Sequence, residues 1–283
     1  MKLAVASGKG GTGKSMMATN LAFTLAWTGQ VTLVDCDVEE PNLHLFFPAP
    51  ATTRDVTMPV PVVNESLCDH CGKCGKFCQY GALTVLPDRV LFFPELCHSC
   101  GGCRLVCPKN AIREEPKKIG TLSTSAPMPG LTLVSGTLDE GSPHAVPVIR
   151  DAKKHAARGP VVILDTAPGT SCPVVEALEG CDACILVTES TPFGLHDLQL
   201  AVDVAARLGI PAGIVINRSD GNDRETLRFC TDHDLEVMMT VPFDREIAAI
   251  QSRGDLLCRV KPEWQKDFWA LFAKCRALTG VDG

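Results

Sequence analysis

The sequence has 283 residues, 45% of them hydrophobic, so it is long enough to form one large domain or two ordinary domains around a real core. Its formal net charge of -6 offers no basic field to a phosphate backbone, which argues against nucleic acid as a partner. No run of about 18 apolar residues occurs and the chain starts directly in a strand-like segment, so we expect no membrane span, no signal peptide and a cytoplasmic location.

The first segment of the chain predicts a strand, a glycine-rich loop and a helix. Residues 3–6 are apolar, and residues 16–26 carry apolar side chains at helical spacing before Gly29. The loop between them fits G-x-x-x-x-G-K-[ST], in which backbone N–H groups face phosphate oxygens, the lysine meets the terminal phosphates and the serine reaches magnesium. We therefore predict a nucleoside triphosphate site with magnesium, formed by Gly8, Lys9, Gly10, Gly11, Thr12, Gly13, Lys14 and Ser15.

Further short apolar runs predict strands that end at polar residues. Helical patterns at 195–208 and 223–233 separate the later runs, which indicates an α/β fold with a doubly wound, mostly parallel sheet. Ligands bind at the carboxyl ends of the strands in such sheets. The expected strands are 31–34 before Asp35, 131–134, 161–164 before Asp165, 184–187 before Thr188, and 212–216 before Asn217.

The pattern of the sheet is interrupted between about residues 58 and 118. This interval has little helical periodicity and lies between two proline-bearing stretches, 48–61 and 116–129. We expect it to be a small inserted α+β domain, with the sheet resuming near Leu131. The predicted organisation is a nucleotide-binding domain in two parts, 1–57 and 119–283, with an insert at 58–118.

The interval holds eight of the fifteen cysteines, in two runs that each read C-x2-C-x2-C-x3-C. This is the bacterial ferredoxin pattern, in which three thiolates hold one 4Fe-4S cluster and the fourth cysteine holds the other. Zinc is the alternative, although structural zinc sites use pairs of C-x-x-C. One departure is Gln79 after Cys78, where Pro108 follows Cys107. The expected ligand sets are Cys68, Cys71, Cys74 and Cys107 for cluster one, and Cys97, Cys100, Cys103 and Cys78 for cluster two.

The other cysteines are expected to be structural thiols. Cys181 and Cys184 form a C-x-x-C, but Cys184 begins a buried-looking strand. An apolar stripe between Trp264 and Leu278 could bind a membrane, but its mixed charges favour a helix that packs on the core. His70 and His98 lie beside the ligands and are not expected to be ligands. The remaining structural thiols are Cys36, Cys230, Cys258 and Cys275.

With Lys9 as an added lysine in the loop, the sequence resembles the deviant phosphate-loop ATPases of the MinD and Mrp group, which includes the nitrogenase iron protein. The resemblance extends to 35–37 and 165–169, which are similar to the two switches of that group, and to 191–198. It implies that Lys9 reaches the nucleotide of a dimer partner, Asp37 positions the attacking water, and Asp165 is linked to magnesium through water. Asn217 and Arg218 resemble the adenine-reading position; the run 217–220 also imitates a guanine motif, so GTP remains an alternative to ATP.

The resemblance implies a slow, partner-stimulated ATPase that forms a nucleotide-dependent homodimer, or a heterodimer with a paralogue. Coupled to two clusters, it would gate electron transfer to a redox partner protein. Alternatives are a carrier that transfers a cluster to an apo-client protein, and a positioning or scaffold ATPase that senses redox state. Cys172 follows Asp165 at an offset that resembles a cluster-binding cysteine of the nitrogenase iron protein, so a third cluster shared across a dimer is an alternative to a plain thiol.

Overall fold

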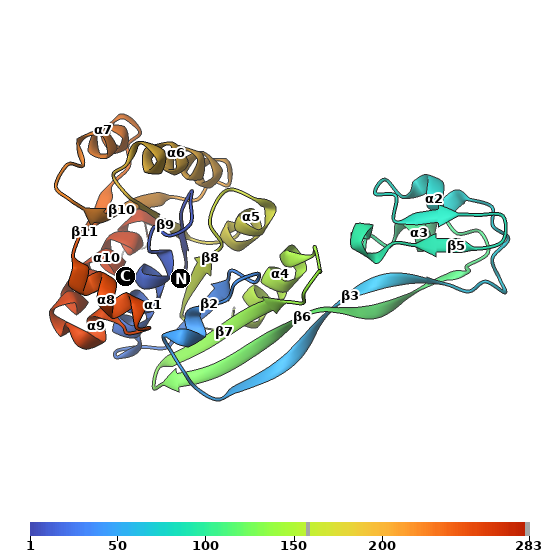
Figure 1. The fold of residues 1–283 in the computed structure, drawn as a ribbon, viewed down its shortest axis with the longest axis horizontal. Coiled ribbons are helices and arrows are strands. Elements are labelled where there is room, and N and C mark those ends of the chain that lie inside the picture. Colours follow the sequence, from blue (N-terminus) through green and yellow to red (C-terminus); the bar gives the residue numbers. More distant parts are fainter. Residues whose placement is uncertain (157–158, 281–283) are drawn as a thin grey trace.

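A nine-stranded sheet runs through the body of the protein in the order β11-β10-β9-β1-β8-β2-β7-β6-β3 (Figure 1). The computed structural model describes residues 1–156 and 159–280. Seven neighbouring strands are parallel, as predicted, whereas β6 pairs antiparallel with β7 and β3 pairs antiparallel with β6. The strands are β1 (Lys2–Ala6), β2 (Val31–Cys36), β3 (Ala51–Val63), β6 (Ile112–Met128), β7 (Leu131–Leu138), β8 (Val161–Thr166), β9 (Ala183–Thr188), β10 (Ala212–Ser219) and β11 (Val237–Pro242).

Helices cover both faces of this sheet, so the central strands, such as β2 and β9, bury side chains on both sides. Along β1, Leu3 and Val5 belong to one core cluster while Ala4 and Ala6 belong to the other. The first cluster packs under α1 (Lys14–Ala26), α8 (Arg245–Ser252), α9 (Leu257–Val260) and α10 (Gln265–Leu278). The second packs under α4 (Ala145–Ala156), α5 (Cys172–Leu178), α6 (Pro192–Arg207) and α7 (Arg224–Asp232).

The C-terminal stripe packs on the core, as the mixed charges around it suggested. Phe268, Leu271 and Cys275 of α10 are fully buried in the first cluster. Among the described residues, the helices are all too short or too polar to cross a membrane.

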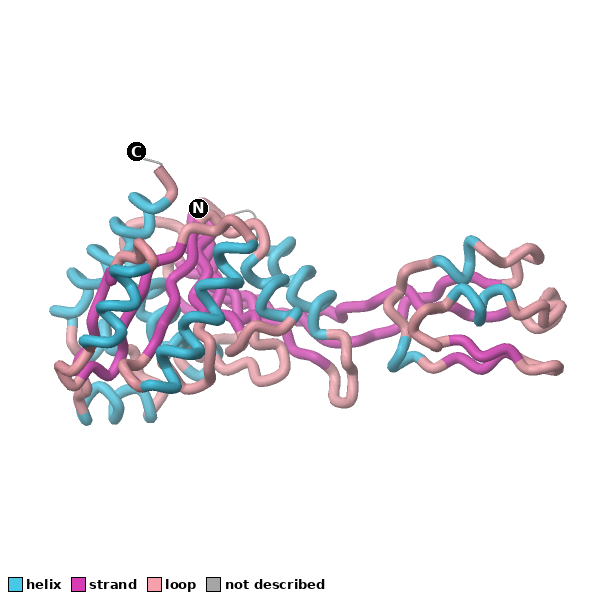
Figure 2. The backbone as a smooth tube through the Cα atoms, turned by 90° about the horizontal axis from the view of Figure 1, so that it is seen from above, coloured by secondary structure: helices cyan, strands magenta, loops and turns pink. Residues whose placement is uncertain are grey.

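The stretches expected to flank an insert are instead two long strands that continue the main sheet. β3 and β6 pair from Ala51 with Ser125 to Val63 with Ile112, and they leave the body together as a two-stranded ribbon (Figure 2). The expected boundaries after residues 57 and 118 therefore fall inside continuous strands. Proline lacks an N–H and is confined to edge positions, and both strands of a two-stranded ribbon are edges. That is why Pro59 and Pro116, which pair with each other, fit here.

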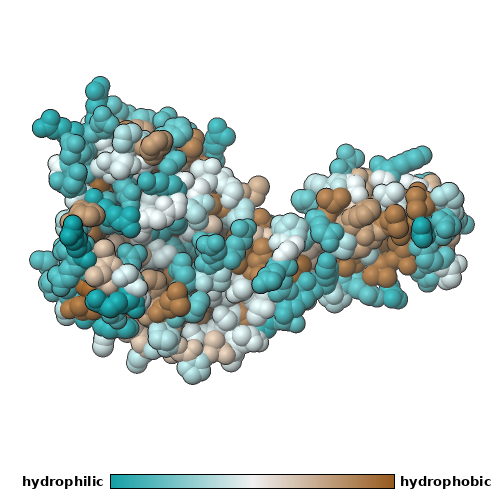
Figure 3. Space-filling model, in the orientation of Figure 1, coloured by the Kyte–Doolittle hydropathy of each residue, from teal (hydrophilic) through white to brown (hydrophobic). Residues whose placement is uncertain are grey.

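A small unit at the far end of the ribbon contains residues 64–111, referred to below as the cysteine unit (Figure 1). Its buried core is formed by Cys74 and Leu83 together with Ile112, the first residue of β6. Several of its large apolar side chains are exposed, and Figure 3 shows hydrophobic residues gathered on this unit. Its elements are α2 (Lys73–Phe77), β4 (Leu83–Val85), β5 (Val90–Phe92), the short 3-10 turn η2 (Pro94–Leu96) and α3 (Gly102–Leu105).

Candidate functional site

The glycine-rich loop connects β1 with α1 and can be formed only with glycine at specific positions. Gly11 and Gly13 have φ values of 79° and 98°, a left-handed region that other residues rarely adopt. A Cβ at Gly13 would also strike the side chain of Asn217, and one at Gly8 would overlap the backbone of Asp197. The first turn of α1 contains no acidic residue, so its N–H groups and the positive end of its dipole are available to an anion.

Three ionisable groups are buried behind this loop. The register between β2 and β8 places Asp35 beside Asp165, and Lys14 is only 7% exposed. Burial raises the pKa of Asp165 to about 7 and that of Asp35 to about 8. Burial lowers the pKa of Lys14, against the opposing effect of Asp165 and Asp37. Within the part of the chain that the structure describes, Asp165 Oδ1 is buried with no hydrogen-bond partner, so an acceptor oxygen remains available to a cation.

The loop after β2 is held in place by the carboxyl group of Asp35. This group accepts hydrogen bonds from the backbone N–H groups of Asp37 (3.2 Å), Asn42 (2.9 Å) and Leu43 (3.0 Å). Asp37 is half-buried, and burial raises its pKa while Lys14 opposes the shift. The sequence singled out Asp37 but not the anchoring role of Asp35; an aspartate within a fully buried strand was the signal for it.

The loop after β8 lies directly against the glycine-rich loop. Gly169 donates a backbone hydrogen bond of 2.9 Å to the carbonyl of Ser7, and a Cβ added at Gly10 would lie 3.9 Å from the ring of Pro168. An open hollow separates this loop from the loop after β2, with Asp37, Pro168 and Ser171 in its lining. The two segments expected to act as switches are therefore adjacent in space.

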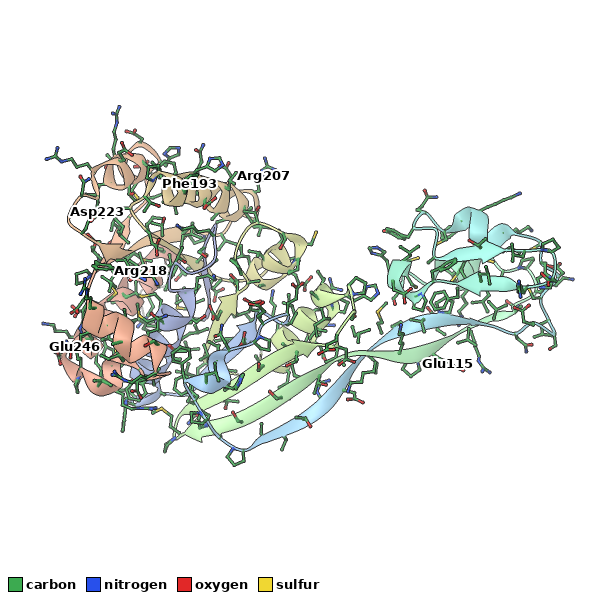
Figure 4. All side chains as sticks on the ribbon, viewed as in Figure 1. Glu115, Phe193, Arg207, Arg218, Asp223 and Glu246 are labelled. Carbon is green, nitrogen blue, oxygen red and sulfur yellow. The ribbon has the colours of Figure 1, made fainter. Side chains whose placement is uncertain are left out.

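On the opposite side of the glycine-rich loop, residues from β9 and β10 form a polar cluster. Asn217 is buried and donates a 2.7 Å hydrogen bond to the carbonyl of Thr12. Glu189 forms one ion pair with Lys9 (3.3 Å) and another with Arg218 (2.6 Å). Figure 4 shows Arg218 on the body, far along the molecule from Glu115 of the ribbon. Glu189 was missed by the sequence analysis, although its place just after a predicted strand could have identified it.

All fifteen cysteines are unpaired, and eight of them line two hollows in the cysteine unit. Each hollow combines the three closely spaced cysteines of one run with the fourth cysteine of the other run. The structure thus brings together the same two groups of four that the spacing of the runs predicts. Cys97, Cys100, Cys103 and Cys78 line the hollow nearer the body, and Cys68, Cys71, Cys74 and Cys107 line the farther one.

The two cysteine runs share one backbone conformation. Positive φ angles occur immediately before and after the second cysteine of each run, at His70 and Gly72 and again at Ser99 and Gly101. A short helix then begins in each run, and a further positive φ occurs three residues after the last cysteine. Two of these residues, histidine and serine, rarely adopt such angles, and such backbone conformations concentrate at functional sites.

Backbone and aromatic groups surround the two hollows. The N–H of Ala111 donates to Cys107 Sγ at 3.3 Å. The two histidines next to the cysteines have other partners: His70 pairs with Glu65 at 3.0 Å, and His98 stacks on Tyr80 with ring centroids 3.7 Å apart.

The other cysteines lie apart from these hollows. Cys172 is exposed at the start of α5, just beyond the loop after β8. Cys181 and Cys184 are buried, and burial raises the pKa of the Cys181 thiol to about 11. Four further cysteines are buried in the body, namely Cys36, Cys230, Cys258 and Cys275.

Comparisons with known proteins identify the family to which the chain belongs. A sequence model of the CobQ/CobB/MinD/ParA nucleotide binding domain matches residues 3–257. The chain is 32% identical to uncharacterized protein MJ0579 of Methanocaldococcus jannaschii over 267 residues, 90% of either chain. The fold is similar to that of the septum site-determining protein MinD of Pyrococcus horikoshii in complex with Mg-ADP (TM-score 0.60, 19% identity, 100% of this chain and 98% of that one). It is also similar to a ParA family ATPase of Chlorobium tepidum (TM-score 0.57, 18% identity, 95% and 98%). The chain therefore belongs to the CobQ/CobB/MinD/ParA nucleotide binding domain family.

Proposed function

We propose that the protein binds and hydrolyses ATP and that its nucleotide state controls electron transfer through two 4Fe-4S clusters. The observation that carries this proposal is the pair of four-cysteine hollows on a ribbon continuous with the nucleotide-binding sheet. The ribbon links the two sites through one sheet, so a change near the phosphate loop has a structural route to the cysteines.

At the nucleotide site, catalysis rests on positioning and on neutralising charge at the phosphate oxygens. In our proposal Lys14 meets the terminal phosphates, Ser15 and Asp165 hold magnesium, and Asp37 orients the attacking water. Support comes from the unpartnered, buried Oδ1 of Asp165, an oxygen of the kind that magnesium prefers. The positive end of α1 supports phosphate binding in the same way.

In our proposal the adenine base and the dimer partner bind on the side of the glycine-rich loop where Asn217 and Glu189 lie. Asn217 and Arg218 are proposed to contact the adenine base. Lys9 is held by Glu189 within its own chain, and we propose that it exchanges this ion pair for the nucleotide of a second protomer. The partner in that dimer is a second copy or a paralogue.

The cysteine unit fits 4Fe-4S clusters better than zinc. Each hollow takes three cysteines from one run and one from the other, whereas a structural zinc site takes two C-x-x-C pairs. Cys68, Cys71, Cys74 and Cys107 would hold one cluster, and Cys97, Cys100, Cys103 and Cys78 the other. When bound, each cluster accepts or gives one electron. The N–H of Ala111 already points at a ligand sulfur, a contact that tunes reduction potential.

The proposal that the cysteines hold clusters is tested by measuring the iron, acid-labile sulfide and zinc content of anaerobically purified protein. We expect about eight irons per chain, because two complete four-cysteine sets are present. Cys100→Ser should lower the iron content by about half, while Cys172→Ser, which changes a cysteine outside both sets, should not. Zinc in place of iron and sulfide would overturn the proposal. Loss of the clusters to an added apo-ferredoxin would favour the carrier alternative, and reversible reduction without such loss would favour electron transfer.

A further inference from the structure

The pairing of β3 with β6 is irregular where the ribbon leaves the sheet. Val56 pairs with Gly120 and Thr57 pairs with Lys118, so Ile119 is an extra residue in β6. Gly120 is also the first residue of β6 that pairs with β7, so the residues of β6 before it pair with β3 alone. From Thr57 outward the ribbon has two strands and extends roughly 20 Å to Val63, at about 3.3 Å per residue. A β-bulge at such a position bends the strand and disrupts the ladder, so the cysteine unit is carried by an arm with a hinge at its base.

The hinge, the bulge at Ile119, is hydrogen-bonded to the residue that follows β7, and the last residue of β7 is bonded in turn to the loop after β2. The N–H of Asp139 donates to the carbonyl of Ile119 at 2.9 Å. The N–H of the preceding residue, Leu138, donates to the carbonyl of Val38 at 2.8 Å. Val38 immediately follows Asp37 and is buried in the second core cluster. Two adjacent residues therefore connect the predicted water-positioning loop with the base of the arm.

The same segment also reaches the cysteine unit directly. At its end, Nε2 of His144 donates to the carbonyl of Pro94 at 3.3 Å, and the His144 ring meets that of His98 edge to face with centroids 6.4 Å apart. His98 stacks on Tyr80, and both line the nearer four-cysteine hollow. In the part of the chain that the structure describes, this is the hydrogen bond that joins residues 64–111 to the body outside the ribbon.

We propose that residues 138–144 are a relay and latch that couples the loop after β2 to the position of the cysteine unit. A shift of Val38 displaces Leu138 and Asp139, which moves the hinge at Ile119 and withdraws His144 from Pro94. The unit then swings on its arm and uncovers the Tyr80 and His98 side of the nearer hollow. The inference rests on the proposed function for the source of the shift, the nucleotide, and adds the residues that transmit it.

Amide hydrogen exchange in the full chain tests the relay. It is measured without nucleotide, with Mg-ADP and with a non-hydrolysable Mg-ATP analogue. We expect the analogue to raise exchange of the amides at 95–98 about fivefold, the effect of losing one ordinary hydrogen bond, and to change exchange at 138–139. The phosphate loop should become protected at the same time. Protection of the phosphate loop with no change at 95–98 or 138–139 would overturn the relay while leaving nucleotide binding intact. No protection anywhere would refute nucleotide binding itself, and with it the relay.

A pair of histidine variants tests the latch separately. His144→Ala should raise exchange at 95–98 in every nucleotide state and remove the further increase with the analogue. The matched control is His155→Ala, which removes a histidine that pairs with Thr124 of the sheet at 3.2 Å and does not touch the cysteine unit. It should behave like the unchanged protein. If the two variants give the same exchange at 95–98, His144 is not a latch.

Discussion

The two neighbouring carboxyl groups behind the phosphate loop predict that the nucleotide-free protein loses stability as the pH rises. In the folded state the pKa of Asp165 is raised to about 7 and that of Asp35 to about 8, against an ordinary value of 3.8. A raised folded pKa means that the folded state holds more protons than the unfolded state. The resulting stabilisation is present in full below the ordinary pKa and is lost as the pH rises through the folded pKa.

The size of the effect follows from these shifts. Between about pH 6 and pH 8, Asp165 loses one proton from the folded state only, which corresponds to about 1 kcal/mol, and Asp35 adds about 2 kcal/mol. For a chain of this length, a loss of about 1 kcal/mol lowers the melting temperature by roughly 3 °C. In our proposal magnesium binds beside Asp165 and favours the charged form of its carboxyl group, so Mg-ATP should stabilise the protein more at the higher pH.

The assay is thermal unfolding of nucleotide-free protein at about pH 6 and pH 8. It compares the unchanged chain with Asp165→Asn. Asparagine keeps the shape but cannot ionise, and it also removes the charge repulsion that adds to burial in raising the pKa of Asp35. The variant should lose at least 3 °C less than the unchanged chain on going to high pH. Asp203→Asn on the exposed side of α6 is the control for a general charge effect. Equal pH dependence in all three proteins would refute the reasoning.

Three further substitutions have defined outcomes. Lys14→Ala should lower ATP turnover by roughly 10²-fold or more while iron content stays unchanged, measured by phosphate release and iron analysis; surviving turnover would remove the role of Lys14. Asn217→Ala removes the 2.7 Å hydrogen bond to Thr12 and should cost about 1–3 kcal/mol in urea unfolding, against no change for the exposed Asn222→Ala. Cys172→Ala should leave the iron content per chain unchanged, and a loss of iron would point to the third, shared cluster.

Local sequence patterns predicted the nucleotide-binding part of the fold well. The helix expected at 16–26 is observed at Lys14–Ala26, and the strand expected at 184–187 is observed at Ala183–Thr188. These elements are defined by apolar spacing within one segment. The glycines of the phosphate loop are likewise required locally, because Gly11 and Gly13 have positive φ angles. The four cysteines that line each hollow are those that the ferredoxin pattern of the two runs groups together, while the clusters themselves stay a prediction.

Contacts between distant segments were not predictable in the same way. The ribbon was missed because Pro59 and Pro116 argue against strands unless the strands are known to be edges, and edge position depends on tertiary structure. Glu189 pairs with two cations that lie 180 and 29 residues away in the chain, which no local pattern shows. The contact of His144 with Pro94 depends in the same way on where the arm places the cysteine unit.

The central claim is that nucleotide state controls the redox centres of the cysteine unit. Redox titration of the anaerobically purified protein, followed by EPR, tests this claim most directly when it is repeated without nucleotide, with Mg-ADP and with Mg-ATP. We expect the reduction potential of at least one of two 4Fe-4S signals to differ between the ATP and ADP states, and Lys14→Ala to abolish that difference. Signals whose potentials are the same in all three states would contradict the coupling, and protein without any iron-sulfur signal would contradict the clusters themselves.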